Sequence, residues 1–255
     1  MEIYYTIIVF VFGALFGSFF NVVGYRLPKG ESIVFPASHC PNCNHKLSGW
    51  ELIPILSFLC LGGKCKKCKQ KISWMYPAFE FITGSLFALS YVLYGFSINF
   101  VIAITVVSTL LIVIISDLRY FIIPDEILLI GSILLLLEYC IQGGWEQALQ
   151  ALINGVIAFG IMFAIKCFGD RLFKKESMGG GDIKLLFFFG MLLGWPLSIL
   201  SIFLASFIGL PISLFILYKK KTHVIPFGPF LSVAAFLLFF LPIDMNMIID
   251  LLILK

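Results

Sequence analysis

The stretch INFVIAITVVSTLLIVIISD, residues 98–117, decides the fold class of this chain. It carries no charge before Asp117, and an α-helix needs about 20 residues to cross the hydrocarbon core of a bilayer. The rest of the chain has the same character, since 60% of its 255 residues are hydrophobic and only 13% are charged. Such a composition cannot be buried in one aqueous core and requires lipid as a solvent. We therefore expect an all-α polytopic membrane protein.

Apolar runs of similar length recur on both sides of this stretch. The first has Glu2 in place of a basic N-terminal region, and no small-residue cleavage site follows it, so we interpret it as a retained helix. The sixth is short and Gly-rich, which predicts a helix that is tilted or buried among its neighbours, and the last is interrupted by Pro242 and Asp244. We expect about eight transmembrane helices, near residues 3–23, 78–94, 98–116, 126–142, 148–167, 183–196, 198–217 and 228–250.

The positions of Lys and Arg predict the orientation in the membrane. If residues 24–77 are cytoplasmic, strict alternation of the spans puts 17 of the 18 basic residues on that side, and only Lys255 lies opposite. This bias predicts a multi-pass protein of the inner (cytoplasmic) membrane with its N-terminus outside. The formal net charge of +4 is too small to indicate a nucleic-acid partner. Membrane lipid is the expected surrounding.

Residues 24–77 form the only sizeable polar segment, and they contain two CxxC pairs. The four cysteines are Cys40, Cys43, Cys65 and Cys68. Two such pairs at this spacing are typical of a tetrahedral zinc site, whose four protein ligands leave no position open for catalytic water. We therefore predict structural zinc, with a redox-active dithiol as the alternative, since stable disulfides are disfavoured in the cytoplasm. We interpret His39 and His45 as surface residues and not as ligands.

Acidic residues beside membrane spans are costly and therefore suggest a role. Asp117 ends the third span, and Asp182 follows Gly179-Gly180-Gly181 just before the sixth. The predicted topology puts both at the cytoplasmic boundary, on different helices that a bundle can bring together. Two nearby carboxyls can share a proton and act as acid and base on a peptide bond. The glycines would let a substrate backbone approach closely.

A structural interpretation competes with this one for each acid. Asp125 and Asp182 both stand where a helix begins and could be N-terminal caps. Arg119 could offset the charge of Asp117 at the end of its helix. Glu80, close to the cytoplasmic boundary, could be an interfacial anchor or part of a second functional site.

The ordered set of motifs resembles the type IV prepilin peptidases, which are GxGD-type membrane aspartyl proteases. The resemblance covers nearly the whole chain. Its motifs are the N-terminal 17-GSFFNVV-23 with 25-YRLP-28, the two CxxC pairs, 52-LIP-54, 76-YPAFE-80, Asp117 with 124-PD-125, 178-MGGGDIKLL-186 and 226-PFGP-229. Lys64 stands where Arg is often found.

The resemblance implies that Asp117 and Asp182 are the catalytic pair, with Asp125 and the three glycines as a supporting loop. It implies cleavage of the basic leader from prepilins or pseudopilins, then methylation of the new N-terminal residue with S-adenosylmethionine. We expect Asn21, Arg26 and Glu80 to help form the methylation site. The predicted domains are a first transmembrane helix (1–23), a cytoplasmic zinc-binding loop associated with methyl transfer (24–77) and a transmembrane peptidase (78–255).

The same residues leave three other functions open. The first is a prepilin peptidase without methyltransferase activity, and only an assay for methyl transfer distinguishes it from the enzyme with both activities. A transporter would also use broken helices and intramembrane acids, but it explains neither the cysteine loop nor two acids at one membrane boundary. A zinc-binding membrane scaffold would need no acid pair.

Overall fold

The structure is a computed structural model that describes residues 2–176, 178–220 and 225–241. Within these ranges it contains helices, two isolated antiparallel bridges and no strand. The all-α expectation is therefore confirmed for the described part of the chain. Five of its helices are long and apolar enough to cross a membrane.

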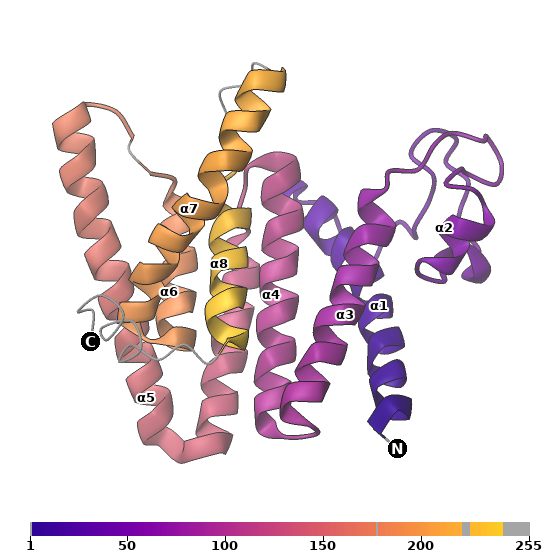
Figure 1. The fold of residues 1–255 in the computed structure, drawn as a ribbon. Coiled ribbons are helices and arrows are strands. Elements are labelled where there is room, and N and C mark those ends of the chain that lie inside the picture. The colour runs from indigo at the N-terminus through magenta and orange to yellow at the C-terminus, as the bar shows by residue number, and fades with distance from the viewer. Residues whose placement is uncertain (1, 177, 221–224, 242–255) are drawn as a thin grey trace. The chain divides into compact units, whose positions relative to one another are not determined.

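The helices fall into two compact units, Met1–Ile115 and Ser116–Lys255. The first unit contains α1 (Glu2–Arg26), the 3-10 helices η1 (Leu27–Lys29) and η2 (Gly49–Leu52), α2 (Leu56–Cys60), α3 (Met75–Tyr94) and most of α4 (Ile98–Tyr120) (Figure 1). The second contains the end of α4, then α5 (Asp125–Phe173), α6 (Gly180–Leu193), α7 (Trp195–Lys220) and α8 (Gly228–Phe240).

In the first unit, α1 and α3 lie side by side along small residues. A Cβ added at Gly13 would lie 2.8 Å from the Phe87 Cβ, and one added at Gly84 would lie 2.8 Å from the Phe10 carbonyl oxygen. Helices in lipid commonly associate through such small residues, because these let the backbones approach closely. This packing leaves polar side chains of both helices, among them Asn21 and Glu80, buried at the same interface.

In the second unit, α5 turns back on itself and forms two antiparallel halves (Figure 1). The turn is at Gly143 and Gly144, and Gly144 has φ +78°, which only glycine adopts without strain. It lies in the gap between the predicted spans 126–142 and 148–167. The second half packs tightly on α6, since a Cβ added at Gly190 would lie 2.7 Å from the Ala158 Cβ.

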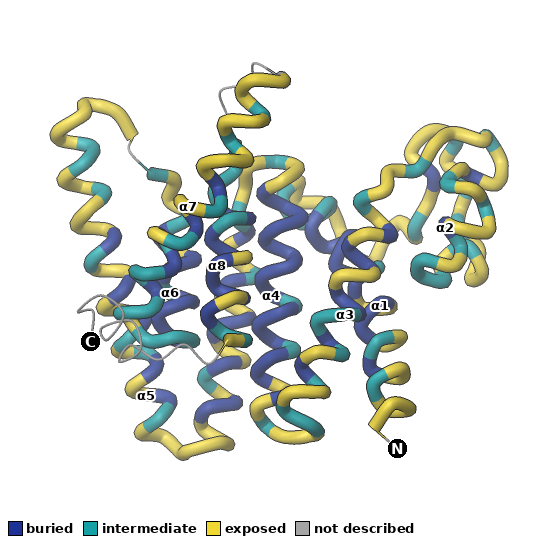
Figure 2. The backbone as a smooth tube through the Cα atoms, in the orientation of Figure 1, coloured by how far each residue is buried: buried dark blue, intermediate teal, exposed yellow. Residues whose placement is uncertain are grey.

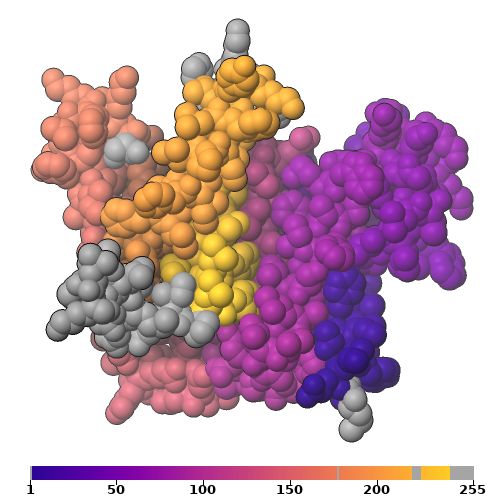
Figure 3. Space-filling view, viewed as in Figure 1, coloured from indigo at the N-terminus to yellow at the C-terminus, as the bar shows by residue number. Residues whose placement is uncertain are grey.

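The short helix α6 is the core of the second unit. Its buried residues include Ile183, Leu185, Leu186, Phe188 and Phe189. Most of α6 has the colours of buried and intermediate residues in Figure 2. The second half of α5 packs against it, and so do α7 and α8, whose side chains lie next to each other in the space-filling view (Figure 3). The prediction that this helix is buried among its neighbours is confirmed.

Not every predicted span has the length of a membrane crossing in the described residues. Helix α5 contains two of the predicted spans, whereas α6, with 14 residues, and α8, with 13, are shorter than the five candidates. The part of the last predicted span beyond residue 241, with Pro242 and Asp244, lies outside the described residues.

Candidate active site and candidate metal centre

Asp117 lies in the last turn of α4 and is buried, with 6% of its surface exposed. The backbone N–H of Gly228, the first residue of α8, donates a hydrogen bond of 3.0 Å to its Oδ2. The first N–H groups of a helix have no partner within it, so the start of α8 offers Asp117 a donor. The end of one helix and the start of another therefore fix this carboxyl.

Asp182 is the third residue of α6 and lies next to Asp117. The charge of Asp117 acts directly on the Asp182 carboxyl, so the two carboxyls are electrostatic neighbours. The Oδ2 of Asp182 lies above Gly179, where an added Cβ would come within 3.2 Å of it. The fold therefore brings together the two acids that the sequence analysis paired.

The glycines around the pair differ in what surrounds them. A Cβ at Gly228 would lie 2.6 Å from Asp117 Oδ2, and a Cβ at Gly181 would lie 3.0 Å from the Ile123 Cβ. A Cβ at Gly180 would meet nothing within 4 Å. A Cβ at Gly228 would thus collide with the Asp117 carboxyl and one at Gly181 would crowd Ile123, whereas Gly180 borders open space.

The residues after α4 also hold the pair in place. The Ser116 hydroxyl donates to the Ile122 carbonyl at 2.6 Å, and the Phe121 N–H donates to the Asp117 carbonyl at 3.0 Å. Phe121 has φ +57°, which allows the chain to reverse directly after α4. This reversal brings Ile123 beneath Gly181.

Asp125 does not contact the Asp117–Asp182 pair in the interactions of the described residues; its partner is Lys184. Its exposed carboxylate accepts two hydrogen bonds from Lys184 Nζ, at 2.6 and 2.8 Å. The interpretation of Asp125 as an N-cap is wrong in position: Pro124 is the cap residue, and Asp125 is the first residue of α5. The ion pair stands at an apolar groove of about 590 Å³ between α5 and α6, lined in part by Leu128 and Phe187.

Two neighbouring carboxyls, one buried and the other partly buried, have a definite chemical capacity. Both cannot be ionised at low cost, so they tend to hold one proton between them. A carboxylate and a carboxylic acid side by side can remove a proton from water and donate one to a carbonyl oxygen. The arrangement therefore suits hydrolysis of an amide bond.

The four cysteines of the loop form two turns of the same construction. In the first, the Cys40 N–H donates to the His45 carbonyl and the Asn44 N–H to the Cys40 carbonyl. In the second, the Cys65 N–H donates to the Gln70 carbonyl and the Lys69 N–H to the Cys65 carbonyl, which is the same pattern. Asn44 and Lys69 both have positive φ, 52° and 58°. A short antiparallel bridge closes each turn.

The sulfurs of the two turns converge on one point. The Cys40 and Cys68 sulfurs lie 3.8 Å apart and those of Cys43 and Cys65 lie 3.9 Å apart, and all four are within 4.8 Å of one another. A tetrahedral zinc ion with Zn–S bonds of about 2.3 Å places its sulfurs about 3.8 Å apart. The cluster therefore fits a four-coordinate metal ion such as zinc.

Backbone donors favour thiolates at two of the four positions. The Asn42 and Cys43 N–H groups lower the pKa of Cys40, and the Gln70 N–H, with the Asn42 side chain, lowers the pKa of Cys68 to about 6. The His45 N–H has the same effect on Cys43, but burial and the three neighbouring sulfurs outweigh it and raise the pKa of Cys43 to about 11. Four thiolates this close together need a cation, which a bound metal ion supplies.

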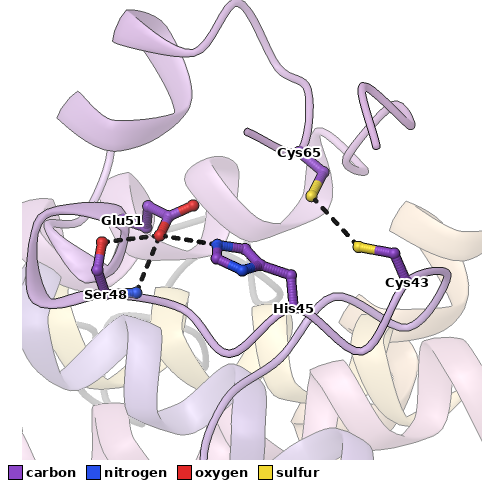
Figure 4. A network of polar contacts seen from close by, with 5 residues as sticks. All are labelled: Cys43, His45, Ser48, Glu51 and Cys65. Carbon is purple, nitrogen blue, oxygen red and sulfur yellow. Dashed lines mark hydrogen bonds and ion pairs between the residues drawn. The ribbon is translucent and has the colours of Figure 1, made fainter. Parts of the chain in front are cut away.

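His45 belongs to a different network (Figure 4). Its Nε2 lies 3.3 Å from Glu51 Oε2, the atom that also accepts hydrogen bonds from the Ser48 N–H at 2.9 Å and the Ser48 hydroxyl at 2.7 Å. The Ser48 donors lower the pKa of Glu51 to about 2, with a smaller contribution from His45. Among the described residues the candidate metal cluster contains neither histidine, in agreement with the sequence interpretation.

Asn21, Arg26 and Glu80 make contacts within the first unit. The buried Asn21 amide donates to the Gly17 and Tyr76 carbonyls, at 3.1 and 3.3 Å, and its Oδ1 has no hydrogen-bond partner. Glu80 Oε2 accepts from the Ile55 N–H at 2.7 Å.

Arg26 Nη1 donates to two loop carbonyls, those of Ser32 and Pro36, at 3.1 and 2.8 Å. Tyr25 and Tyr76 stack beside these contacts, with their ring centroids 5.3 Å apart. Together these residues hold the polar loop on α1 and α3.

Two contacts were not foreseen in the sequence. The PFGP motif does not indicate that Asp117 accepts the Gly228 N–H, because the two residues lie 111 positions apart. The motif 178-MGGGDIKLL-186 includes Lys184, whose charge suggests an ion pair, but the sequence does not indicate that its partner is Asp125. The only local signal for the Gly228–Asp117 contact is the Gly-Pro start of α8, where the first N–H has no partner within the helix.

Comparison with known proteins gives a consistent result. Residues 11–94 match the Bacterial Peptidase A24 N-terminal domain, and residues 104–214 match the Type IV leader peptidase family. No solved structure matches the chain.

Several curated relatives are named prepilin leader peptidase/N-methyltransferase. The Bacillus subtilis protein is 37% identical over 204 residues, 79% of each chain. The Pseudomonas putida protein is 30% identical over 92% of this chain and 90% of its own length. The Neisseria gonorrhoeae protein is 32% identical over 90% of this chain and 88% of its own.

Proposed function

Because the chain belongs to the type IV leader peptidase family, we propose that it cleaves the leader peptide of type IV prepilins or pseudopilins and then methylates the new N-terminal residue. The names of its relatives pair these two activities. The observation that carries the peptidase activity is the carboxyl pair formed by the buried Asp117 and the partly buried Asp182, on which the charge of Asp117 acts. S-Adenosylmethionine is the methyl donor in this proposal.

In the proposed cleavage, Asp117 and Asp182 act as one acid–base pair. The ionised carboxyl removes a proton from water while the water oxygen attacks the scissile carbonyl carbon, and the protonated carboxyl donates its proton to the carbonyl oxygen. When the C–N bond breaks, the leaving amine nitrogen takes up a proton and becomes the new N-terminus. The Gly228 N–H orients Asp117, and the open space at Gly180 leaves room for an extended substrate backbone.

The proposed topology has eight membrane crossings, two of them from α5. The N-terminus is outside, and residues 24–77 and both aspartates are at the cytoplasmic face, as the positive-inside bias favours. A prepilin has a basic leader in the cytoplasm and an apolar helix in the membrane, so its scissile bond falls at the depth of the carboxyl pair. Lipid surrounds the helices, and nucleic acid has no part in the activity.

The predicted domains remain part of this proposal. Residues 1–23 form the first transmembrane helix, 24–77 the cytoplasmic loop associated with methyl transfer, and 78–255 the transmembrane peptidase. We propose that the four cysteines bind one structural zinc ion, which would hold the two turns together and take no part in either reaction.

We propose that Asn21, Arg26 and Glu80 help form the methylation site. The methyl donor is a sulfonium cation with an adenine amino group, so its binding calls for hydrogen-bond acceptors and negative charge. The unpartnered, buried Asn21 Oδ1 is such an acceptor. Glu80 is buried on α3 and accepts the N–H of Ile55 in the loop. Arg26 supports the loop beside them through the Ser32 and Pro36 carbonyls.

The purified enzyme, incubated with a prepilin with and without S-adenosylmethionine, tests both activities. Mass spectrometry of the product should show loss of the leader in both samples and gain of one methyl group only with the donor. Cleavage without methylation would leave a peptidase alone, and no cleavage would overturn the proposal. At least one substitution at Asn21, Arg26 or Glu80 should cleave normally and fail to methylate; if all three methylate fully, the site lies elsewhere.

A further inference from the structure

Ile55 has a backbone conformation that its side chain disfavours. Its φ is 62° and its ψ −53°, and the Leu56 N–H donates to the Pro54 carbonyl at 2.5 Å, which closes a three-residue γ-turn. This form of the turn is strained, and a β-branched residue at positive φ adds to the strain. Such a conformation persists only where surrounding contacts hold it.

Glu80 supplies the contact that holds this turn. Its Oε2 accepts the Ile55 N–H at 2.7 Å, which is a short hydrogen bond. The carboxylate is buried, with 8% of its surface exposed, and the Ser18 hydroxyl donates to it as well. Helices α1 and α3 therefore fix the acceptor, and the acceptor fixes the turn.

The turn is the starting point of the chain that leads to the second pair of cysteines. Ile55 directly precedes α2, whose Phe58 packs edge-on against Trp74 with ring centroids 4.7 Å apart. The Phe58 carbonyl accepts the Gly63 N–H at 2.9 Å, and Cys65 follows two residues later. The orientation of Ile55 thus determines where α2 and the Cys65–Cys68 turn lie.

We propose that Glu80 is a positioning residue for methyl transfer, which acts by holding the strained turn at Ile55 and not by contact with the methyl donor. This inference rests on the proposed methyltransferase function and specifies the role of Glu80 within it. A glycine at position 55 adopts φ near +60° without strain. It should therefore make the Glu80 hydrogen bond largely unnecessary.

The test is a rescue experiment in the full-length enzyme. Glu80→Leu removes the acceptor and should lower the rate of methyl transfer by about tenfold or more, since small misplacements cost that much. Adding Ile55→Gly should restore most of the rate. Ile53→Gly is the matched control: it makes the same change two residues earlier, where φ is −67°, and should not rescue. In all of these variants the rate of cleavage of the same prepilin should stay near that of the wild type, which shows that the enzyme is folded.

Each result decides the proposal. If Ile55→Gly does not restore methyl transfer to Glu80→Leu while cleavage is normal, Glu80 acts in another way and the proposal is overturned. Full methyl transfer by Glu80→Leu alone also overturns it. If Glu80→Leu does not accumulate, Glu80→Gln replaces it: with the amide oxygen as acceptor it should methylate nearly normally, and a loss as large as that expected for leucine contradicts the proposal.

A second measurement separates this inference from the proposed function. Limited proteolysis of residues 24–77 should be faster in Glu80→Leu and return toward wild type with Ile55→Gly, whether or not the enzyme methylates. A wild-type enzyme that never methylates would overturn the methyltransferase proposal, and with it the role of Glu80 in that reaction. The proteolysis result would still decide whether Glu80 holds the turn.

Discussion

The Asp117–Asp182 pair and the four-cysteine cluster both bring groups of like charge together, and they differ in what relieves the repulsion. Asp117 is buried in the last turn of α4, Asp182 is partly buried in the first turn of the short helix α6, and the two can share a proton. The thiols belong to short turns of an exposed loop and fit a metal ion. A shared proton can be transferred to a substrate, whereas a metal with four protein ligands serves structure. Substitutions at the two sites should therefore affect the two proposed activities differently.

The largest effect on cleavage is expected at the carboxyl pair. Asp117→Asn and Asp182→Asn each keep the shape of the side chain and remove its proton exchange. Each should slow cleavage by about 10³-fold or more, with expression and zinc content retained. The measurement is the rate of leader removal from a purified prepilin. Near-normal cleavage by either variant would remove the acid–base pair from the mechanism.

A smaller loss is expected when the orientation of Asp117 is disturbed and its carboxyl kept. In Gly228→Ala the new Cβ would lie 2.6 Å from Asp117 Oδ2, so one of the two must move. Cleavage should fall by about 10- to 100-fold. Gly160→Ala, where an added Cβ meets nothing within 4 Å, is the matched control and should cleave normally. Equal rates for the two variants would show that the Gly228 contact does not position Asp117.

The ion pair of Asp125 and Lys184 should matter less, because it is exposed. Asp125→Asn and Lys184→Met should each change cleavage by only a few-fold, and their coupling in a double-mutant cycle of stability should be below about 1 kcal/mol. The cycle is measured by thermal unfolding in detergent. A loss of cleavage as large as that of Asp182→Asn would place Asp125 in the acid–base machinery.

The smallest effect on cleavage is expected at the cysteines. Cys40→Ser and Cys68→Ser should lower zinc from about one ion per chain and expose the loop to proteolysis, while the carboxyl pair keeps its activity. Elemental analysis and cleavage rates measure the two effects side by side. Absence of metal from carefully prepared wild-type protein would refute the zinc prediction. If the cleavage rate of the cysteine variants fell in proportion to their zinc content, the two sites would not be functionally distinct.

How far the sequence could predict these sites depends on the range of the interaction. The CxxC pairs are local patterns, so the sequence pointed to one shared site, and the sulfurs do converge. The turn of α5 could be expected from an apolar run that breaks at Gly143-Gly144. The contact of Gly228 with Asp117 joins distant segments and has no local signal. The positive φ of Ile55 contradicts its local preference, since β-branched residues avoid that conformation, and the Glu80 contact that we propose to hold it lies 25 residues away in the sequence.

The reversal of α5 at Gly143-Gly144 decides whether the two acids can meet at all. Asp117 ends one helix and Asp182 stands near the start of another, and all of α5 lies between them. If α5 ran straight, an odd number of crossings would separate the aspartates and leave them at opposite faces of a bilayer. The reversal makes the number even. An even number of crossings between the two aspartates, which the turn at two glycines inside α5 provides, is therefore a precondition for the proposed chemistry.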